Sequence, residues 1–423
     1  MKSIVEMIIH VKRGFLAHLT NEIYKRGYEI QRVMKLESQR DRDMFHFEIT
    51  YHNDEKFNGL IDKIKKHENN FEIVSIYNPI EDRLVGGSLK VSGKFSIENS
   101  FDYDIKISGA LDLILKRIDE REDGIIYTGL SKNIGLISGL FPQLDCMKGL
   151  LRTQVINEMD SVIINRFSGL NAYPVTINYT HIDDFIKILK GIESTFSAIR
   201  ITYIDGQDDI SLYDRIISET SLPVLTKYYD EIPLYLLITI LHLYKKHKVD
   251  IKESNVGVIG INISSLRLTS LLIDLGFSRI LGNDINERMM FSFEKEGGLA
   301  TTRENIFSNS DLIIIFKNHI DTQDMEKFGP GQIVISLVDD DIDKSILVER
   351  GVKEFLNGNW MNLSILFPGI LKGLIKSDID HLNNTRLINL SNMISDREFA
   401  EEIAPDLFTD IHEKISGFVQ KLS

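Results

Sequence analysis

The sequence predicts an α/β protein with several domains, and three observations support this fold class. Strand-like and helix-like segments alternate along most of the chain, which is typical of sheets covered by helices. The first 80 residues show strand and helix patterns in the order βαββαβ, which predicts a small ferredoxin-like sandwich. From Asn255 onward, short apolar strands alternate with helices, which predicts a Rossmann-like, doubly wound domain.

The elements of the first region follow from the spacing of its apolar residues. Short apolar or alternating runs predict strands at 4–9, 28–36, 45–51 and 71–77. Apolar residues that recur every three or four positions predict helices at 15–23, ended by Gly27, and at 57–64. The turn-forming pairs Asn78-Pro79 and Gly86-Gly87 then mark the exit from this region.

The middle region is expected to form another α/β layer. Its predicted strands are 166–178 and 198–205, and its predicted helix at 182–189 has Thr180 as N-cap. The longest apolar stretch, 232–244, contains Pro233 and His242 and is too short to cross a bilayer. It is therefore expected to be a buried helix.

The third region has the alternation of a nucleotide-binding domain. A strand is expected at 256–261, followed by a helix at 264–275 that ends at Gly276. The next strand is expected at 279–281, and Asp284 follows its end. Further strands are expected at 312–316 and 333–338, and 396–422 should be helical and pack back on the body. The predicted domains are 1–80, 81–250, 251–375 and 376–423.

Composition limits the partners and the compartment. The 423 residues carry 49 Lys and Arg against 62 Asp and Glu, a net charge of −13, which argues against nucleic acid as a partner. The single cysteine, Cys146, excludes an intrachain disulfide and a Cys-rich zinc site and is expected to be a buried thiol. Glu6 interrupts the N-terminal apolar run, so we expect no secretory signal, a cytoplasmic location and no membrane partner.

The first 80 residues resemble an ACT domain, a small ligand-sensing module. The segment 11–16, Val-Lys-Arg-Gly-Phe-Leu, is similar to the glycine turn between that module's first strand and first helix. The resemblance implies that Arg13, Gly14 and Phe15 contact a small-molecule effector such as an amino acid. The alternative is that Gly14 only starts the helix.

The remaining chain resembles the malic enzymes, in the bacterial form with an N-terminal ACT domain. Four stretches carry this resemblance in the family's order: Arg-Phe-Ser-Gly-Leu-Asn-Ala-Tyr-Pro-Val at 166–175, Ser-Leu-Pro-Val at 221–224, Leu-Phe-Pro-Gly-Ile-Leu-Lys-Gly at 366–373, and Ile-Ala-Pro to Phe at 403–408. The resemblance implies a fold built to oxidise malate with NAD(P) and to decarboxylate the product, with a divalent metal polarising the reacting oxygen.

Several residues that the resemblance assigns to this chemistry are replaced. The family's metal-binding carboxylates correspond to Thr202-Tyr203 and Lys227-Tyr228, and its general base, a lysine, corresponds to Asp160. The family's tyrosine segment corresponds to 106–109, which contains no tyrosine. We therefore expect the divalent metal to be lost, and no catalytic residue is assigned.

Two acidic groups leave a displaced metal site open as a minority alternative. One is the run Asp339, Asp340, Asp341 and Asp343, for which a solvated loop is the simpler interpretation. The other comprises Asp205, Asp208, Asp209, Asp230 and Glu231. The substrate-contacting asparagine pair keeps only Asn362, because its neighbour is Leu363.

The dinucleotide fingerprint is half retained. Its three glycine positions hold Gly260, Asn262 and Ser265, and Asp284 stands where a ribose-binding acid belongs. The side chain of Asn262 would occupy space that a pyrophosphate needs, so weak NAD binding is expected. The alternative is that these residues are remnants on a retained fold.

The sequence therefore predicts a malic-enzyme-like pseudoenzyme with a regulatory or ligand-sensing role. Its expected partners are a second copy of itself or an active malic enzyme. The rival hypothesis is an NAD(P)-dependent malic enzyme, or a related 2-hydroxy-acid oxidoreductase, with relocated metal and catalytic groups. A third hypothesis, intermediate between these two, is a nucleotide-binding scaffold that catalyses no reaction.

Overall fold

The computed structural model describes residues 3–38, 41–51, 54–67, 69–90, 94, 96–120, 124–141, 146–206, 210–317, 322–338, 344–357, 361–397 and 405–422. The chain divides into two compact units, Met1–Lys90 and Val91–Ser423, and each is described by itself. The domain boundaries expected at 80, 250 and 375 stay predictions. Among the described helices, none is both long and apolar enough to cross a membrane.

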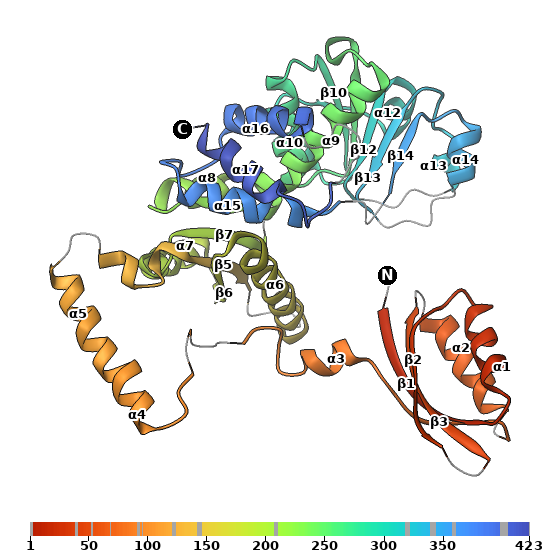
Figure 1. Cartoon of the computed structure of the whole chain (residues 1–423). Helices are drawn as coiled ribbons and strands as arrows, with labels where there is room; N and C mark the ends of the chain where they lie inside the picture. The colour runs from red at the N-terminus through yellow and green to blue at the C-terminus, as the bar shows by residue number, and fades with distance from the viewer. Residues whose placement is uncertain are drawn as a thin grey trace. The chain divides into compact units, whose positions relative to one another are not determined.

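The first unit is the βαββαβ sandwich that the sequence predicts. Its antiparallel sheet has the order β2-β3-β1-β4, and α1 and α2 lie on one side of it (Figure 1). The side chains between the sheet and these helices, among them Met7, Leu19 and Phe47, are buried and form the unit's core. The elements are β1 Ser3–Lys12, α1 Leu16–Tyr24, β2 Glu29–Ser38, β3 Arg42–Tyr51, α2 Asp54–Lys65, β4 Phe71–Tyr77 and α3 Pro79–Leu84.

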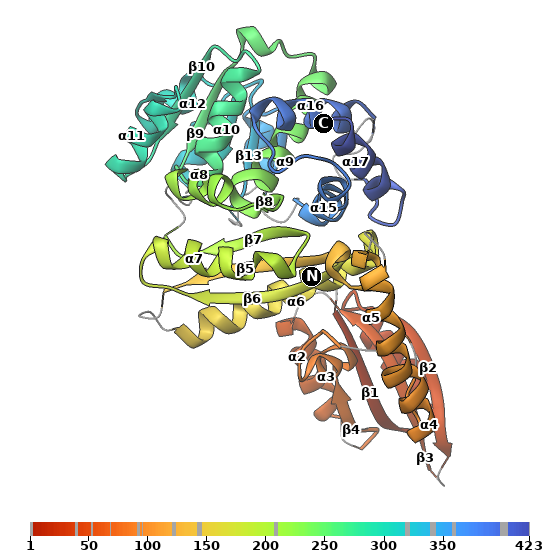
Figure 2. The same ribbon diagram turned by 90° about the vertical axis from the view of Figure 1, so that its left-hand side faces the viewer.

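The second unit begins with an extended helical arm and a parallel four-stranded sheet of order β6-β5-β7-β8. Figure 2 shows α6 and α7 beside this sheet. The arm comprises α4 Ser100–Tyr103, η1 Asp104–Gly109 and α5 Ala110–Glu120; η2 Gly124–Tyr127 and η3 Leu130–Lys132 follow. The layer comprises β5 Asn133–Leu140, α6 Cys146–Ser168, β6 Asn171–Asn178, α7 Ile182–Ile192, η4 Glu193–Thr195, β7 Ala198–Ile204, α8 Ile210–Glu219 and β8 Val224–Thr226.

Two local predictions in this layer are wrong. The strand expected at 166–178 starts only at Asn171, because α6 continues to Ser168 and Gly169 then reverses the chain at φ +71°. The backbone N–H of Gly169 donates to the carbonyl of Asn165, which closes the last helical turn. The N-cap of α7 is His181 and not Thr180. The side chain of Cys146 lies outside the described residues.

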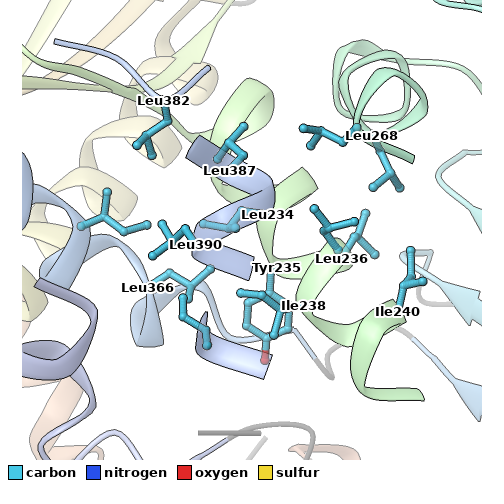
Figure 3. Packing of buried hydrophobic residues seen from close by; sticks show 14 of the residues in the cluster. Leu234, Tyr235, Leu236, Ile238, Ile240, Leu268, Leu366, Leu382, Leu387 and Leu390 are labelled. Carbon is cyan, nitrogen blue, oxygen red and sulfur yellow. The ribbon is translucent and has the colours of Figure 1, made fainter. Parts of the chain in front are cut away.

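The helix predicted from the longest apolar stretch is confirmed as the centre of the second unit's core. It is α9 (Ile232–His247), which follows the π-helical turn η5 (Lys227–Glu231) and has Pro233 in its first turn. Figure 3 shows Leu234, Tyr235 and Ile238 of α9 packed near Leu366 and Leu390. Nearly every side of α9 is covered by protein, so the helix can be apolar all round and needs no polar face.

The predicted doubly wound domain is confirmed as a six-stranded parallel sheet of order β11-β10-β9-β12-β13-β14. Its strands are β9 Asn255–Ile259, β10 Arg279–Asn283, β11 Leu299–Ala300, β12 Leu312–Ile315, β13 Ile333–Ser336 and β14 Glu354–Leu356. The preceding turn is η6 Ile251–Glu253, and the helices are α10 Ile263–Asp274, α11 Glu287–Lys295, α12 Arg303–Asn309, α13 Thr322–Met325 and α14 Lys344–Glu349.

The C-terminal elements are η7 Leu363–Ile365, α15 Phe367–Ile375, α16 Asn384–Arg397 and α17 Ile411–Gln420. The prediction of a helix over 396–422 is wrong for 405–410, which precede α17, and 398–404 lie outside the described residues. The expected packing against the body is confirmed, since α17 contacts α15, α16 and α6. Gly369 and Gly373 permit the close crossing of α15 and α17, because an added Cβ would come within 2.7 Å of the His412 carbonyl or 2.6 Å of Val419.

Candidate functional site

A cavity of about 320 Å³ opens beside the four-stranded sheet, at the carboxyl ends of β5 and β7. In parallel α/β sheets this is the edge at which ligands bind. The polar side chains that line the cavity come from α6, β7, the residue after β7, and η5: Arg152, Thr153, Asn157, Thr202, Tyr203, Asp205, Lys227 and Tyr228. Thr202-Tyr203 and Lys227-Tyr228, the two predicted replacements of metal ligands, are thus brought together in one cavity.

A chain of hydrogen bonds fixes the floor of this cavity. The Thr202 hydroxyl donates to the carbonyl of Ile137 at 3.2 Å, so its oxygen accepts from the Ser138 hydroxyl at 3.0 Å. The Ser138 oxygen accepts in turn from Nδ2 of Asn157 at 2.7 Å. Asn157 turns its NH₂ group toward Ser138, which leaves the Ser138 hydroxyl able to donate to Thr202.

A second network, next to the cavity, is built on a buried arginine. Arg200 on β7 is 1% exposed, and its guanidinium binds Glu231 of η5 through two bonds, Nε to Oε1 at 2.5 Å and Nη2 to Oε2 at 2.8 Å. Its Nη1 donates to Oδ2 of Asp160 on α6 at 2.6 Å. Its Cζ also lies 4.1 Å from the ring centre of Phe367 in α15. The predicted position Asp160 is therefore the partner of a cation.

The electrostatics of this network follow from burial and pairing. Burial lowers the pKa of Arg200, but the charges of Glu231 and Asp160 and their hydrogen bonds outweigh burial and raise the pKa overall. Burial lowers the pKa of Lys227, and the nearby charge of Arg200 lowers it further, while Asp160 and Glu231 oppose this shift. Within the part of the chain that the structure describes, no carboxylate forms an ion pair with Lys227.

The described acidic residues of the proposed displaced metal site all accept hydrogen bonds from protein groups, and of these residues Asp205 lines the cavity. Glu231 binds Arg200, and Oδ2 of Asp230 accepts from the backbone N–H and the hydroxyl of Thr226 at 2.8 and 2.9 Å. Burial raises the pKa of Asp230 to about 6 against the effect of these bonds. Asp205 accepts from the N–H of Phe141 at 2.7 Å and from the Tyr203 hydroxyl at 2.8 Å.

The described residues contain no cluster of three His, Cys, Asp or Glu side chains that could hold a metal ion. The other candidate metal ligands, Asp208, Asp209 and the run at 339–343, lie outside the described residues.

The four predicted cofactor residues meet at the turn between β9 and α10. Gly260 has φ +80°, and an added Cβ would lie 2.6 Å from the backbone nitrogen of Lys317, so the position requires glycine. Asn262 and Ser265 form a capping box: the Asn262 side chain accepts from the Ser265 N–H at 3.0 Å, and the Ser265 hydroxyl accepts from the Asn262 N–H at 2.8 Å. Asp284 accepts from the N–H of Ile261 at 2.6 Å.

This turn fits a dinucleotide only in part. The glycine, the helix N-terminus and the acid after β10 are present, as the predicted fold requires. However, three backbone N–H groups of the turn, those of Ile261, Asn262 and Ser265, are already bonded within the chain. A pyrophosphate would compete with these internal bonds.

The other predicted site residues take local structural roles. Asn362 is the N-cap of η7, and its side chain accepts from the Ser364 N–H at 3.2 Å. Gly14 has φ +89° in the turn before α1, and Arg13 donates to the Ser38 hydroxyl at 3.0 Å. Phe15 precedes α1 and packs against Phe71, with ring centres 6.3 Å apart. A ligand role for these four residues stays a prediction.

Sequence reasoning missed Arg200 and Asn157, and it named Glu231 only as a possible metal ligand, whereas the structure shows Glu231 bound to Arg200. One signal for Arg200 was present, because a charged residue in the apolar strand 198–204 must find a partner when the strand is buried. Asn157 carries no comparable signal, because one amide among the helical residues of α6 does not stand out in the sequence.

The fold defines an α/β protein in which a four-stranded parallel sheet is followed by a doubly wound six-stranded one. No family model matches the chain. The NAD-dependent malic enzyme 1 of Bacillus subtilis is 19% identical over 413 residues, which cover 96% of this chain and 94% of that enzyme. The NAD-dependent malic enzyme of Geobacillus stearothermophilus is 21% identical over 60% of this chain and 58% of its own length.

Solved structures show the same relationship at the level of the fold. The NAD-dependent malic enzyme of Thermotoga maritima has a TM-score of 0.68 at 17% identity, covering 81% of this chain and 99% of that one. The malic enzyme of Entamoeba histolytica has a TM-score of 0.67 at 17% identity, covering 81% of this chain and 80% of that one. The chain is a relative of the malic enzymes and shares their fold.

We predict that Arg200→Met lowers the free energy of unfolding by about 3–5 kcal/mol at neutral pH, because it leaves the carboxylates of Asp160 and Glu231 without their cation. Chemical denaturation measures this loss. The matched control is Arg215→Met, whose guanidinium pairs with Asp183 and Glu219 on the surface and should have a small effect. Equal effects of the two substitutions would show that the buried network does not stabilise the fold.

Proposed function

We propose that this chain is a malic-enzyme-like protein that lacks malate oxidative decarboxylation and acts as a ligand-binding, regulatory homologue. The observation that carries the proposal is the charge arrangement around the cavity. The relatives' reaction, as the resemblance implies it, uses a divalent metal, which needs carboxylate oxygens. Here Arg200 and Lys227 bring positive charge to that region, and the carboxylates of Asp160 and Glu231 are held by Arg200. The carboxylates that such a metal needs are therefore bound to a cation or, in Asp205, to the Phe141 N–H and the Tyr203 hydroxyl.

The replaced lysine supports the same proposal. A general base must have a free acceptor within reach of the proton that it removes. Asp160 stands in the lysine's position and binds Arg200, so its carboxylate serves the ion network. The cavity hydroxyls of Thr202 and Tyr203 are likewise engaged, in bonds to Ile137 and Asp205.

The alternative is an active NAD(P)-dependent oxidoreductase with relocated groups, and one observation favours it. The turn at Gly260 and the acid Asp284 keep the arrangement that a dinucleotide site requires, and relatives of this chain are named NAD-dependent malic enzymes. We propose that NAD binds weakly at this turn, with Asp284 favouring a free ribose 2′-hydroxyl over a 2′-phosphate.

A regulatory role needs partners, and the helical arm offers a surface for one. Among the described residues of α4, η1 and α5 none is buried, and six of their large apolar side chains are more than half exposed: Phe101, Tyr103, Ile105, Leu111, Leu113 and Leu115. An apolar surface of this kind on an extended helix is typical of an interface. We propose that it is covered in a homo-oligomer, or by an active malic enzyme, and that the first unit binds a small effector near Arg13, Gly14 and Phe15.

We predict no malate turnover with NAD or NADP and Mn²⁺, because the loss of even one catalytic group typically costs orders of magnitude in rate. The measurement is NADH or NADPH formation at saturating malate, with the protein omitted in one control and the metal chelated in another. Formation that requires both protein and metal would contradict the proposal and support the alternative.

We predict that Asn262→Gly tightens NAD binding by about tenfold, equivalent to one or a few kcal/mol at most, by removing the side chain at the turn and freeing the Ser265 N–H. Calorimetry with NAD and NADP measures this, and NAD should bind better than NADP. The control is Asn99→Gly, which removes the same kind of N-cap from α4. Tight NAD binding by the unmodified chain, or a preference for NADP, would refute this interpretation of the turn.

We predict that the full chain is a homo-oligomer and that Leu111→Glu with Leu115→Glu dissociates it, because two charges one helical turn apart cannot be buried in an apolar interface. Light scattering measures the mass in solution. Val348→Glu, at a well-exposed position of α14, is the control and should leave the mass unchanged. A monomeric parent chain would argue against self-association.

A further inference from the structure

We propose that His412 is a pH-sensitive switch in the packing of the C-terminal helix α17. While its imidazole is neutral, the helix stays packed against α15 and α6, and when the imidazole takes up a proton the helix detaches. This inference goes beyond the proposed function, because it holds whether or not the chain oxidises malate.

The imidazole of His412 is buried beside aromatic rings. The residue is 3% exposed, and within the described part of the chain neither Nδ1 nor Nε2 has a hydrogen-bond partner of normal geometry. Its ring centre lies 4.6 Å from that of Phe167 on α6, and Phe408, just before α17, lies 5.5 Å from Phe167 on the same measure. Such surroundings accept a neutral imidazole far more readily than an imidazolium, because a buried charge needs a partner.

The charged groups around the ring do not supply that partner. Burial lowers the pKa of His412 below its ordinary value of 6.5, the backbone of Leu407 and the charge of Glu413 oppose this shift, and the charge of Lys372 on α15 adds to it. Lys372 and Glu413 pair with each other. The other charged side chains on the elements that pack near this end of α17 are exposed to solvent: Arg166, Lys376, Asp396, Asp406, Asp410 and Lys414.

Linkage between proton binding and packing gives the direction of the effect. When α17 detaches, His412 regains its ordinary pKa, so the detached state binds the proton more tightly than the packed state. The packed state therefore has its full stability above 6.5, begins to lose stability as the pH falls through 6.5, and goes on losing it down to the lowered pKa. About one pH unit below 6.5, the detached state gains at most about tenfold in population.

The close crossing of α15 and α17 connects this switch to the candidate site. An added Cβ at Gly369 of α15 would lie 2.7 Å from the carbonyl of His412, so His412 lies where the two helices touch. The first residue of α15 is Phe367, whose ring centre lies 4.1 Å from Cζ of the buried Arg200. Detachment of α17 removes support from the helix that packs on Arg200, so the ion network beside the cavity becomes sensitive to pH.

The test is hydrogen exchange of the full chain at about pH 7.5 and about pH 5.5, measured by mass spectrometry and expressed as protection factors, which correct for the intrinsic pH dependence of exchange. Protection of α17 should be about three- to tenfold lower at the lower pH. Protection of β12, a buried strand without titratable residues, should change by less than about twofold. His412→Phe keeps a ring without a titratable group, so its α17 should be protected equally, within about twofold, at both pH values. The matched control is His381→Phe, at a more exposed histidine outside α17, which should behave as the parent does.

The proposal is overturned if α17 of the parent is protected equally at both pH values, or if α17 of His412→Phe loses protection as the parent does. It is also overturned if β12 loses protection in parallel with α17, because the whole chain then unfolds in acid. His412→Leu replaces His412→Phe if the urea midpoint of that variant at neutral pH falls below that of the parent. Metal-dependent malate oxidation would contradict the proposed function alone, whereas pH-independent protection of α17 would contradict only this inference.

Discussion

The pairing of one buried arginine with two carboxylates is the constraint on which the candidate site depends. A buried guanidinium without partners costs several kcal/mol, so Arg200 requires both Asp160 and Glu231 close to β7. These partners come from α6 and from η5, so the network ties a strand, a helix and a π-helical turn together. Phe367 adds a fourth element, α15, through its ring. Three of these four elements supply cavity walls together with β5, so the positions of those walls are set by electrostatics as well as by apolar packing.

The π-helical turn η5 links this network to the hydrophobic core. It contains Lys227 at its start and Glu231 at its end, and it continues directly into α9, a buried helix of the second unit's core. Wide turns of this kind occur frequently at functional sites, because the extra residue changes the direction in which side chains point. Here the same five residues supply a cation to the cavity and a carboxylate to Arg200. Asp230 closes the turn by bonding to Thr226.

The sequence predicted the architecture better than the site, for a physical reason. Apolar periodicity is local, so the strands around Gly260, the buried helix α9 and the βαββαβ unit could all be read directly. The replaced positions Asp160, Thr202 and Lys227 were found by resemblance, but their new contacts were not. Arg200 lies 40 residues from Asp160 and 31 from Glu231, and no local pattern encodes such a pairing. The turn at Asn262 shows the same limit, because its capping box was read as a lost glycine.

In the proposed site, the positive charge near the cavity comes from protein side chains and not from a bound metal ion. A metal ion supplies its charge only while it is bound, and its ligands must be deprotonated, so affinity for the substrate varies with metal concentration and with pH. The guanidinium of Arg200 is a permanent part of the fold, and the ammonium of Lys227 gains stability when an anion arrives. Within the part of the chain that the structure describes, Lys227 lines the cavity and no cluster of three His, Cys, Asp or Glu side chains could hold a metal ion. Reversible binding without turnover is what a sensor requires, and the retained malic-enzyme fold provides the rigid sheet edge on which such a cavity can be built.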